Sequence, residues 1–364
     1  MPALTETALL AALQTVVDPE TGQDFVTGKQ LKNLRINGAA VSFDVELGYP
    51  AASLVDGLRA RLEAAASTVE GVGHITVNIS SKIAAHAVQR GVQLLPGVKN
   101  IVAVASGKGG VGKSTTAVNL ALALAAEGAR VGVLDADIYG PSMPLLLGVS
   151  GPPQSADGKT MEPHVGHGLQ VMSIGFLVDE DQAMIWRGPM ATQALDQLLR
   201  QTHWSDLDYL IIDMPPGTGD IALTLSQRVP LTGAIIVTTP QDIALIDAKK
   251  GLKMFEKVNV PILGLVENMA VHICTNCGHA EHIFGADGGQ KMAQQFGISY
   301  LGALPLAMSI REQADAGKPT VVADPDGEHA ALYKSLARAV AVKIAGQTKD
   351  FSSKFPTITI SKNS

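Results

Sequence analysis

The first eighty residues alternate between helix-like and strand-like patterns of apolar positions. Apolar side chains recur at helical spacing over Ala8–Val17, and Pro19 ends the pattern, because the residue before a proline is pushed out of the helical conformation. Apolar and polar residues alternate on both sides of Asn37-Gly38, a dipeptide typical of a β-hairpin turn. Leucines recur every four residues over Leu54–Leu62, and the run Ile75–Ile79 alternates again. The pattern predicts a small α-β-β-α-β unit.

From residue 99 onward the pattern changes to short apolar runs separated by helical segments. Strands that are apolar on both faces are typical of a parallel sheet covered by helices on both sides. A stripe through Leu332, Leu336, Val340 and Ile344 predicts a last helix, which Gly346 closes. The predicted strands are Ile101–Ala105, Val131–Leu134, Tyr209–Ile212, Ala234–Thr238 and Ile262–Val266.

These patterns predict an α/β protein with two folded units. We expect residues 1–80 to form the small α/β domain and residues 81–98 to connect it to the next unit. Residues 99–346 should form a larger domain, with a mostly parallel sheet flanked by helices. The polar segment 347–364 contains Pro356 and is expected to be a flexible tail.

Composition and charge limit the function classes. Hydrophobic residues make up 46% of the 364 residues and charged residues 17%, which is ample material for a packed core. The net charge of −6 disfavours a nucleic-acid partner, because phosphate backbones are held by basic surfaces. No apolar run approaches the ~20 residues that cross a bilayer, and no basic region precedes the first apolar stretch, since the first basic residue is Lys29. We therefore expect a cytoplasmic protein that binds neither nucleic acid nor a membrane.

A phosphate-binding motif follows the first strand of the larger unit. Residues 107–114 match G-x-x-x-x-G-K-[ST] in full and lie between a predicted strand and a predicted helix. In this motif the backbone N–H groups cradle phosphate oxygens, the lysine reaches the β- and γ-phosphates, and the hydroxyl binds Mg²⁺. The candidate nucleotide-binding residues are Gly107, Lys108, Gly109, Gly110, Val111, Gly112, Lys113 and Ser114, with Lys113 also a catalytic candidate.

Three aspartates and a second lysine could complete this site. Asp213 ends the strand Tyr209–Ile212, which suits a carboxylate that holds Mg²⁺ through water, and the Pro/Gly-rich loop after it suits a switch. Asp135 and Asp137 follow another strand. One could orient the attacking water while the other supports Mg²⁺ or a loop, and the spacing does not assign the roles. Lys108 could add positive charge at the γ-phosphate, in its own subunit or across a dimer.

The only two cysteines of the chain form the pair Cys274-x-x-Cys277. Such a pair can bind a metal or a cluster, or form a redox disulfide. With His279 and His282 it could bind zinc, although the spacing from Cys277 to His279 is tighter than in the usual zinc motifs. A 4Fe–4S cluster takes four thiolates, so two chains about a two-fold axis would supply them. This alternative predicts a homodimer, as the extra lysine of the phosphate loop also does.

Two resemblances make the prediction specific. Residues Lys108–Ser114 resemble the deviant Walker A motif of the MinD/ParA/nitrogenase-iron-protein class of ATPases, whose first lysine reaches the nucleotide of the partner subunit. This resemblance implies that Asp137 positions the attacking water, that Asp213 opens the second switch and that Asn268 reads the adenine edge. The catalytic candidates are then Lys108, Lys113 and Asp137, and the Mg²⁺ candidates are Ser114 and Asp213.

Residues from about 90 to 345 closely resemble the Mrp/ApbC family of iron–sulfur cluster carrier ATPases. The resemblance implies ATP and Mg²⁺ as cofactors and a 4Fe–4S cluster bridging two subunits at Cys274 and Cys277. It also implies a homodimer that transfers the cluster to apo target proteins and works with cluster assembly proteins. The matching stretches are Pro96–Lys108, Leu134–Ser142, Trp186–Met190, Asp213–Asp220, Glu267–Met269 and the Cys274/Cys277 segment.

The N-terminal unit, with Asp18-Pro19-Glu20, resembles the small metal–sulfur-cluster domain that is often fused to these proteins. That domain commonly carries a cysteine where this chain has Tyr49–Ser53, and no cysteine is present here. We therefore expect a docking module without thiol chemistry.

Two other functions are weighed against the carrier. A MinD- or ParA-type positioning ATPase would use a basic amphipathic C-terminal helix or a basic face. The tail Phe351–Ser364 contains Pro356, the net charge is −6, and neither function explains the cysteine pair. A zinc-bridged dimer that binds ATP only as a ligand is the other alternative.

Overall fold

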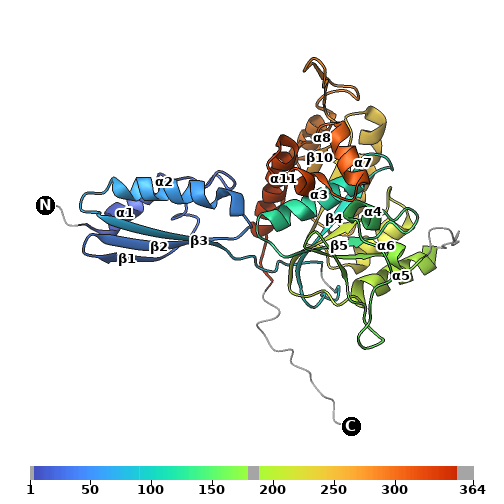
Figure 1. The fold of residues 1–364 in the computed structure, drawn as a ribbon, viewed down its shortest axis with the longest axis horizontal. Coiled ribbons are helices and arrows are strands. Elements are labelled where there is room, and N and C mark those ends of the chain that lie inside the picture. Colours follow the sequence, from blue (N-terminus) through green and yellow to red (C-terminus); the bar gives the residue numbers. More distant parts are fainter. Residues whose placement is uncertain (1–3, 90, 179–187, 351–364) are drawn as a thin grey trace, which may run out of the picture.

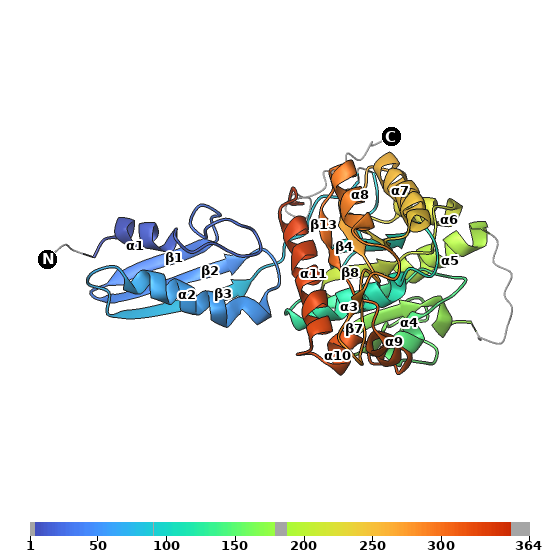
Figure 2. The same ribbon diagram turned by 90° about the horizontal axis from the view of Figure 1, so that it is seen from above.

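The computed structural model describes residues 4–89, 91–178 and 188–350, which fold into two units arranged end to end (Figure 1). A three-stranded sheet with its helices forms the smaller unit, and an eight-stranded sheet forms the larger one. Turning the molecule by 90° shows the same elongated arrangement, with the smaller unit beside the last helix of the larger one (Figure 2).

The smaller unit follows the predicted order of elements. The hairpin at Asn37-Gly38 is confirmed, since Asn37 pairs with Ala40 across a turn in which Gly38 has a φ of +60°. The alternation over the second strand is also confirmed, because Val41, Phe43 and two further apolar side chains point into the core. The elements are α1 (Glu6–Leu13), β1 (Leu31–Asn37), β2 (Ala40–Leu47), α2 (Val55–Ser67) and β3 (His74–Ser81), with β1 antiparallel and β3 parallel to β2.

The central sheet of the larger unit has the strand order β13-β10-β9-β4-β8-β5-β7-β6. All neighbouring strands are parallel except β6, which is antiparallel to β7. Every residue of β5, β8 and β9 is buried, as the fully apolar runs predicted. The strands are β4 (Val98–Ser106), β5 (Val131–Asp135), β6 (His164–Gly166), β7 (Leu169–Ser173), β8 (Leu207–Asp213), β9 (Gly233–Thr238), β10 (Ile262–Glu267) and β13 (Tyr300–Ala303).

Helices cover both faces of this sheet (Figure 2). The last helix buries Leu336, Val340 and Ile344 as predicted, but Leu332 is 40% exposed and the neighbouring Tyr333 takes the buried position. Within the described ranges, no helix combines the length and apolar character needed to cross a membrane. The helices are α3 (Lys113–Ala126), α4 (Met143–Leu147), α5 (Gly188–Arg200), α6 (Asp220–Arg228), α7 (Asp242–Lys257), α8 (Gly288–Phe296), α9 (Met308–Asp315), α10 (Thr320–Ala323) and α11 (Glu328–Ala345).

The connecting segment lies against the larger unit. Ala87 N donates to Thr348 O, and Asp350 N donates to Ala85 O, at 2.9 Å each. His86 between them is buried, with 3.0 Å between its Nδ1 and Asn100 Oδ1. The start of the expected tail is therefore tied to the expected connector, and the rest of that tail lies outside the described residues.

The two units also meet at a buried ionic junction. Glu127, just beyond the end of α3, accepts hydrogen bonds from the backbone N and the hydroxyl of Ser53 at 2.9 and 2.6 Å. Arg338 of α11 donates from Nη1 to Glu127 Oε1 at 2.7 Å and from Nε to Glu20 Oε1 at 2.6 Å. The Glu127 side chain is 1% exposed, so its charge depends on these partners.

Candidate functional site

The phosphate loop runs from the end of β4 into the start of α3, at the carboxyl edge of the parallel sheet. Gly110 and Gly112 have φ values of +79° and +78°, in the left-handed region that glycine adopts without strain. Gly107 lies directly against α7, and a Cβ there would overlap the backbone of Asp247. The loop therefore needs glycine for its curl at two positions and for close packing at a third.

Asn268 follows β10 and contacts the phosphate loop. Its Nδ2 donates to Val111 O at 2.8 Å, and a Cβ on Gly112 would overlap the same amide nitrogen. The residue is 8% exposed. The structure thus brings Asn268 to the loop, as its proposed place in a nucleotide site requires, with its amide hydrogen-bonded to the loop backbone.

Lys113 lies between two carboxylates. Its Nζ is 2.6 Å from Asp213 Oδ1, 3.9 Å from Asp137 Oδ2 and 3.3 Å from Ser114 Oγ. The Lys113 side chain is 6% exposed, and Asp213 is fully buried. The structure therefore gathers four of the predicted site residues, from α3, β8 and the loop after β5.

The donor set fits Mg²⁺, which prefers carboxylate and hydroxyl oxygens. Asp213 Oδ2 is buried without a hydrogen-bond partner among the described residues, while Ser114 also lies beside this carboxylate. A cation bound by water or directly would supply the missing partner of Oδ2.

The two aspartates after β5 have different surroundings. Asp135 is fully buried, and its Oδ2 accepts from Ser142 N, Met143 N and Ser173 Oγ at 2.9 to 3.0 Å. Its Oδ1 accepts from Asp137 N at 3.2 Å. Asp135 thus ties down the loop that carries Asp137, whereas the Asp137 carboxylate faces Lys113. The sequence spacing offered no signal that separates the two.

Burial raises the pKa values of these three carboxyl groups, and the charge of Asp213 adds to the effect at Asp135 and Asp137. Burial, and next the Asp213 charge, raise the pKa of Asp135 to about 7. Burial also raises the pKa of Asp213, against the opposing effect of Lys113. The pKa of Asp137 is raised mainly by burial, again opposed by Lys113. The site therefore concentrates acidic groups whose charge a lysine and a cation would balance.

Lys108 lies in the same loop but outside this cluster. Ser106 Oγ donates to its backbone carbonyl at 2.8 Å, which fixes the loop. Among the residues that the structure describes, the Lys108 side chain forms no ion pair.

The cysteine pair lies on a small ribbon formed by β11 (His272–Ile273) and β12 (Ala280–Glu281). Cys274 N donates to His279 O at 2.9 Å, and Gly278 N donates to Cys274 O at 2.8 Å. Cys277 is exposed, Cys274 is half-buried, and both are free thiols. Alternating apolar runs did not predict this ribbon, because each strand has only two residues.

Backbone groups prepare Cys274 for metal binding. The N–H groups of Asn276 and Cys277 and the Cys277 thiol lower the pKa of the Cys274 thiol. The thiolate is the form that binds metals. A tight turn that aims N–H groups at sulfur is therefore chemically suited to hold iron or another thiophilic metal.

The zinc site considered from the sequence is not assembled within the described part of the chain. His272 Nδ1 lies 3.0 Å from Leu306 O, and His282 Nδ1 lies 2.7 Å from Ala270 O. Across the described residues, no three His, Cys, Asp or Glu side chains gather as metal ligands would. The thiols therefore need ligands from beyond this group to complete a four-coordinate site.

Two segments named in the sequence analysis, Trp186–Met190 and the tail Phe351–Ser364, lie partly or wholly outside the described residues. Trp186 and Arg187 of the stretch Trp186–Met190 are not described, and α5 begins just after them. The same holds for the tail Phe351–Ser364.

Comparisons with known proteins match both units of the chain to described families. Residues 97–341 match the family described as NUBPL iron-transfer P-loop NTPase, and residues 6–78 match the family described as iron–sulfur cluster assembly protein. The iron–sulfur cluster carrier protein of Escherichia coli K12 is 50% identical over 347 residues, which cover 95% of this chain and 94% of that protein. The carrier protein of Pseudomonas fragi is 61% identical over 278 residues, covering 76% of this chain and 97% of that protein.

Solved structures give the same fold. A nucleotide-binding protein of Archaeoglobus fulgidus in complex with ADP has a TM-score of 0.56 and 36% identity, covering 64% of this chain and 90% of that chain. The cell division ATPase MinD of Pyrococcus furiosus has a TM-score of 0.52 at 22% identity, covering 66% of this chain and 98% of that chain, and shares the fold. The chain therefore belongs to the NUBPL iron-transfer family of P-loop NTPases, whose curated members include the iron–sulfur cluster carrier proteins.

Proposed function

We propose that this chain is a homodimeric carrier that hydrolyses ATP to control the binding of a 4Fe–4S cluster and its transfer to apo target proteins. The proposal rests on one observation. A single domain holds both a phosphate loop with its acidic partners and an exposed Cys-x-x-Cys turn. The names of the curated relatives support the same function. Cluster assembly proteins are the expected partners during loading.

In the nucleotide site each group has a proposed role. Lys113 binds the β- and γ-phosphates, Ser114 and Asp213 bind Mg²⁺, and Asp137 orients the attacking water. The backbone of Gly107–Gly112 cradles the phosphates. Lys108 reaches the nucleotide of the partner subunit, which its lack of an ion pair among the described residues supports.

Asn268 has a role beside the base in this proposal. Its contact with Val111 O supports a position at the nucleotide, where the amide can read the adenine edge. Asp135 is a positioning residue, because its contacts hold the loop that carries Asp137.

The cluster is the cargo of the protein. Cys274 and Cys277 of one subunit supply two thiolates and the same pair of a second subunit supplies two more, which completes the ligand set of a 4Fe–4S cluster. Ligands divided between subunits part when the dimer opens. ATP binding and hydrolysis at the interface would therefore change how tightly the cluster is held.

We propose that the segments of the chain have the separate functions that the sequence predicts. Residues 99–346 carry the ATPase and the cysteine pair, and residues 1–80 form a docking module without a thiol. Residues 81–98 connect the two, and the segment from 347 onward is the tail.

Anaerobic reconstitution with iron and sulfide tests this function. We expect about four iron and four sulfide per dimer and a thiolate-to-iron absorption at ~400 nm. Cys274→Ala should abolish both, while His279→Ala, which lies on the same ribbon, should retain them. Stoichiometric zinc without sulfide, or a cluster that survives in Cys274→Ala, would overturn the proposal.

A further inference from the structure

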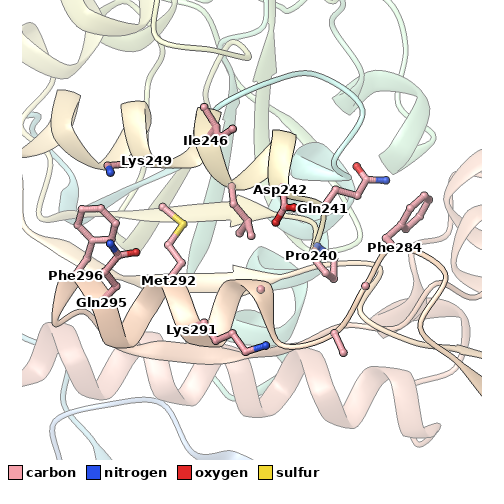
Figure 3. Close-up of a pocket in the computed structure, with 14 residues that line it drawn as sticks. Pro240, Gln241, Asp242, Ile246, Lys249, Phe284, Lys291, Met292, Gln295 and Phe296 are labelled. Carbon is pink, nitrogen blue, oxygen red and sulfur yellow. The ribbon is translucent and has the colours of Figure 1, made fainter.

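A groove of ≈ 650 Å³ runs between α7 and α8 (Figure 3). Leu245, Ile246 and Lys249 line it from α7, and Lys291, Met292 and Phe296 line it from α8. One end is closed by residues 240–242, at the start of α7, and by residues 284–286. None of the functions proposed above uses this groove.

The elements that line the groove also adjoin the phosphate loop and the cysteine ribbon. Its α7 wall packs on the phosphate loop, where the backbone of Asp247 is so close to Gly107 that no Cβ fits between them. Its end wall begins at Phe284, three residues after β12 of the ribbon ends at Glu281. A molecule bound here would therefore contact elements that belong to both sites.

Both helices that line the groove present apolar side chains and one lysine each. Met292 and Phe296 lie toward α7, and the Lys249 Nζ is 5.5 Å from the centre of the Phe296 ring (Figure 3). Lys291 lines the groove from α8 (Figure 3). Asp242 stands at the closed end, in the first turn of α7, where the helix dipole stabilises a carboxylate. The groove thus presents two lysines beside apolar side chains.

The apolar surface continues beyond the groove. Ile246, which lines the groove, is 58% exposed, and outside the groove Ile243 on α7 and Ile283 beside the end wall are 65% and 53% exposed. A small ligand inside the groove would leave Ile243 and Ile283 in water. Apolar surface of this extent is typical of a protein contact.

We propose that the α7–α8 groove docks the protein that receives the cluster, through an amphipathic segment of that protein. The apolar side chains of the segment pack on Met292 and Phe296, and its carboxylates pair with Lys249 and Lys291. The proposal rests on the carrier function proposed above. Charge complementarity selects an acidic segment over a basic one and fixes its orientation.

Docking places the recipient's cysteines next to the ribbon and so raises their effective concentration there. Transfer is then a thiolate exchange without a redox step. Each Fe–S bond to Cys274 or Cys277 breaks as one forms to a recipient thiolate, and the proton that the recipient thiol loses is taken by the released carrier thiolate. Both sides of the exchange therefore balance in bonds, protons and electrons.

The first experiment measures docking without a cluster, so its result does not depend on the carrier function. A fluorescent synthetic peptide with a leucine stripe flanked by glutamates is titrated with the full chain and followed by anisotropy. We expect saturable binding that weakens at least tenfold in Lys249→Glu/Lys291→Glu. The control Lys253→Glu/Lys159→Glu changes the net charge equally at exposed positions outside the groove and should bind as the wild type does. Equal binding by the two double variants, or by a peptide with lysines in place of the glutamates, would overturn the proposal.

The second experiment measures transfer from the reconstituted dimer to apo-aconitase, read as the aconitase activity that returns. The groove variant should need at least tenfold more acceptor for half-maximal rate, with unchanged cluster content, ATPase rate and dimer mass. Loss of the dimer in this variant would mean that a second copy fills the groove and would overturn the proposal. A wild-type dimer that binds no cluster would instead contradict the carrier function, while the peptide titration still decides on the groove.

Discussion

Lys113 and Asp213 form a buried ion pair, with 2.6 Å between Nζ and Oδ1, although 100 residues separate them in the sequence. The pair joins the start of α3 to the end of β8. Because the other oxygen of Asp213 has no hydrogen-bond partner among the described residues, this one lysine carries most of the compensation for the buried charge.

Replacing Lys113 by Met should abolish nucleotide binding and destabilise the fold by about 3–5 kcal/mol at pH 8, because Asp213 is left as an uncompensated buried charge. Burial raises the pKa of Asp213, and loss of the lysine should raise it further. In the folded variant the Asp213 carboxyl group therefore keeps its proton at pH values where the unfolded chain, with a pKa of about 4, has released it. The destabilisation should therefore shrink as the pH falls from 8 to 5.5. Urea unfolding at both pH values measures it, with the 63% exposed Lys250→Met as control, expected to change stability by about 1 kcal/mol or less. An equal loss in both variants would contradict the role of the pair.

The pH dependence of stability should carry the signature of Asp135. Its pKa of about 7 lies above the value of 3.8 expected when unfolded, so its protonated form favours folding. That contribution is complete below pH 3.8 and is lost as the pH rises to about 7. In Asp135→Asn this decline should disappear, and denaturant midpoints across pH 5 to 8 would show it. Parallel pH profiles of the variant and the wild type would exclude the assignment.

Replacing either of two phosphate-loop glycines by alanine should change the stability of the fold by different amounts. Gly107→Ala forces a Cβ into the backbone of Asp247 and should destabilise the fold by about 1–3 kcal/mol, as overpacking does. Gly109 has open space where its Cβ would lie, so Gly109→Ala should change stability by less than about 1 kcal/mol. Thermal unfolding of the two variants measures both effects. Equal destabilisation would show that the close packing of Gly107 against α7 does not require glycine at this position.

Lys108→Ala should lower ATP turnover far more than ATP affinity if this lysine acts across the dimer. Mixing two variant subunits tests whether Lys108 acts in its own subunit or in the partner subunit. Lys108→Ala subunits have an intact Lys113, and Lys113→Met subunits have an intact Lys108, so a mixed dimer contains one complete site. An equal mixture should regain about a quarter of wild-type turnover, because half of its dimers are mixed and each has one of two sites. A mixture as inactive as its two components would place the lysine in its own subunit.

At the junction of the two units, Arg338→Ala should destabilise the protein by about 3–5 kcal/mol, because Glu127 stays buried with only Ser53 to compensate it. The control is Arg311→Ala, whose guanidinium is 62% exposed and pairs with Asp315. It should change stability by about 1 kcal/mol or less. Denaturant unfolding gives both values, and the double variant Arg338→Ala/Glu127→Gln should recover part of the first loss.

The parts of the fold that follow from local patterns could be predicted. Fully apolar runs such as Tyr209–Ile212 mark buried parallel strands, and the Asn37-Gly38 turn marks a hairpin, because each pattern has one physical solution. The phosphate motif is equally local. Leu332 shows the limit, since helical spacing alone cannot tell that its neighbour Tyr333 faces the core.

The parts of the site that depend on tertiary contacts could not be predicted. The spacing of Asp135 and Asp137 does not separate them, and only the fold turns one toward backbone N–H groups and the other toward Lys113. The contact of Asn268 with Val111 joins segments 157 residues apart. The lowered pKa of the Cys274 thiol likewise arises from a turn that the spacing of two cysteines does not specify.

The junction at Glu127 decides how this chain can be divided. A fragment that began at residue 81 would keep every strand of the eight-stranded sheet. It would also lose both Ser53 donors to Glu127 and the Glu20 acceptor of Arg338. The cut would leave Glu127, at one end of α3, with Arg338 as its remaining side-chain partner, while the other end of the helix still holds the phosphate loop. A fragment of residues 81–364 would therefore differ from the whole chain where α3 ends, and nucleotide binding measured on the fragment should not be equated with that of the whole chain.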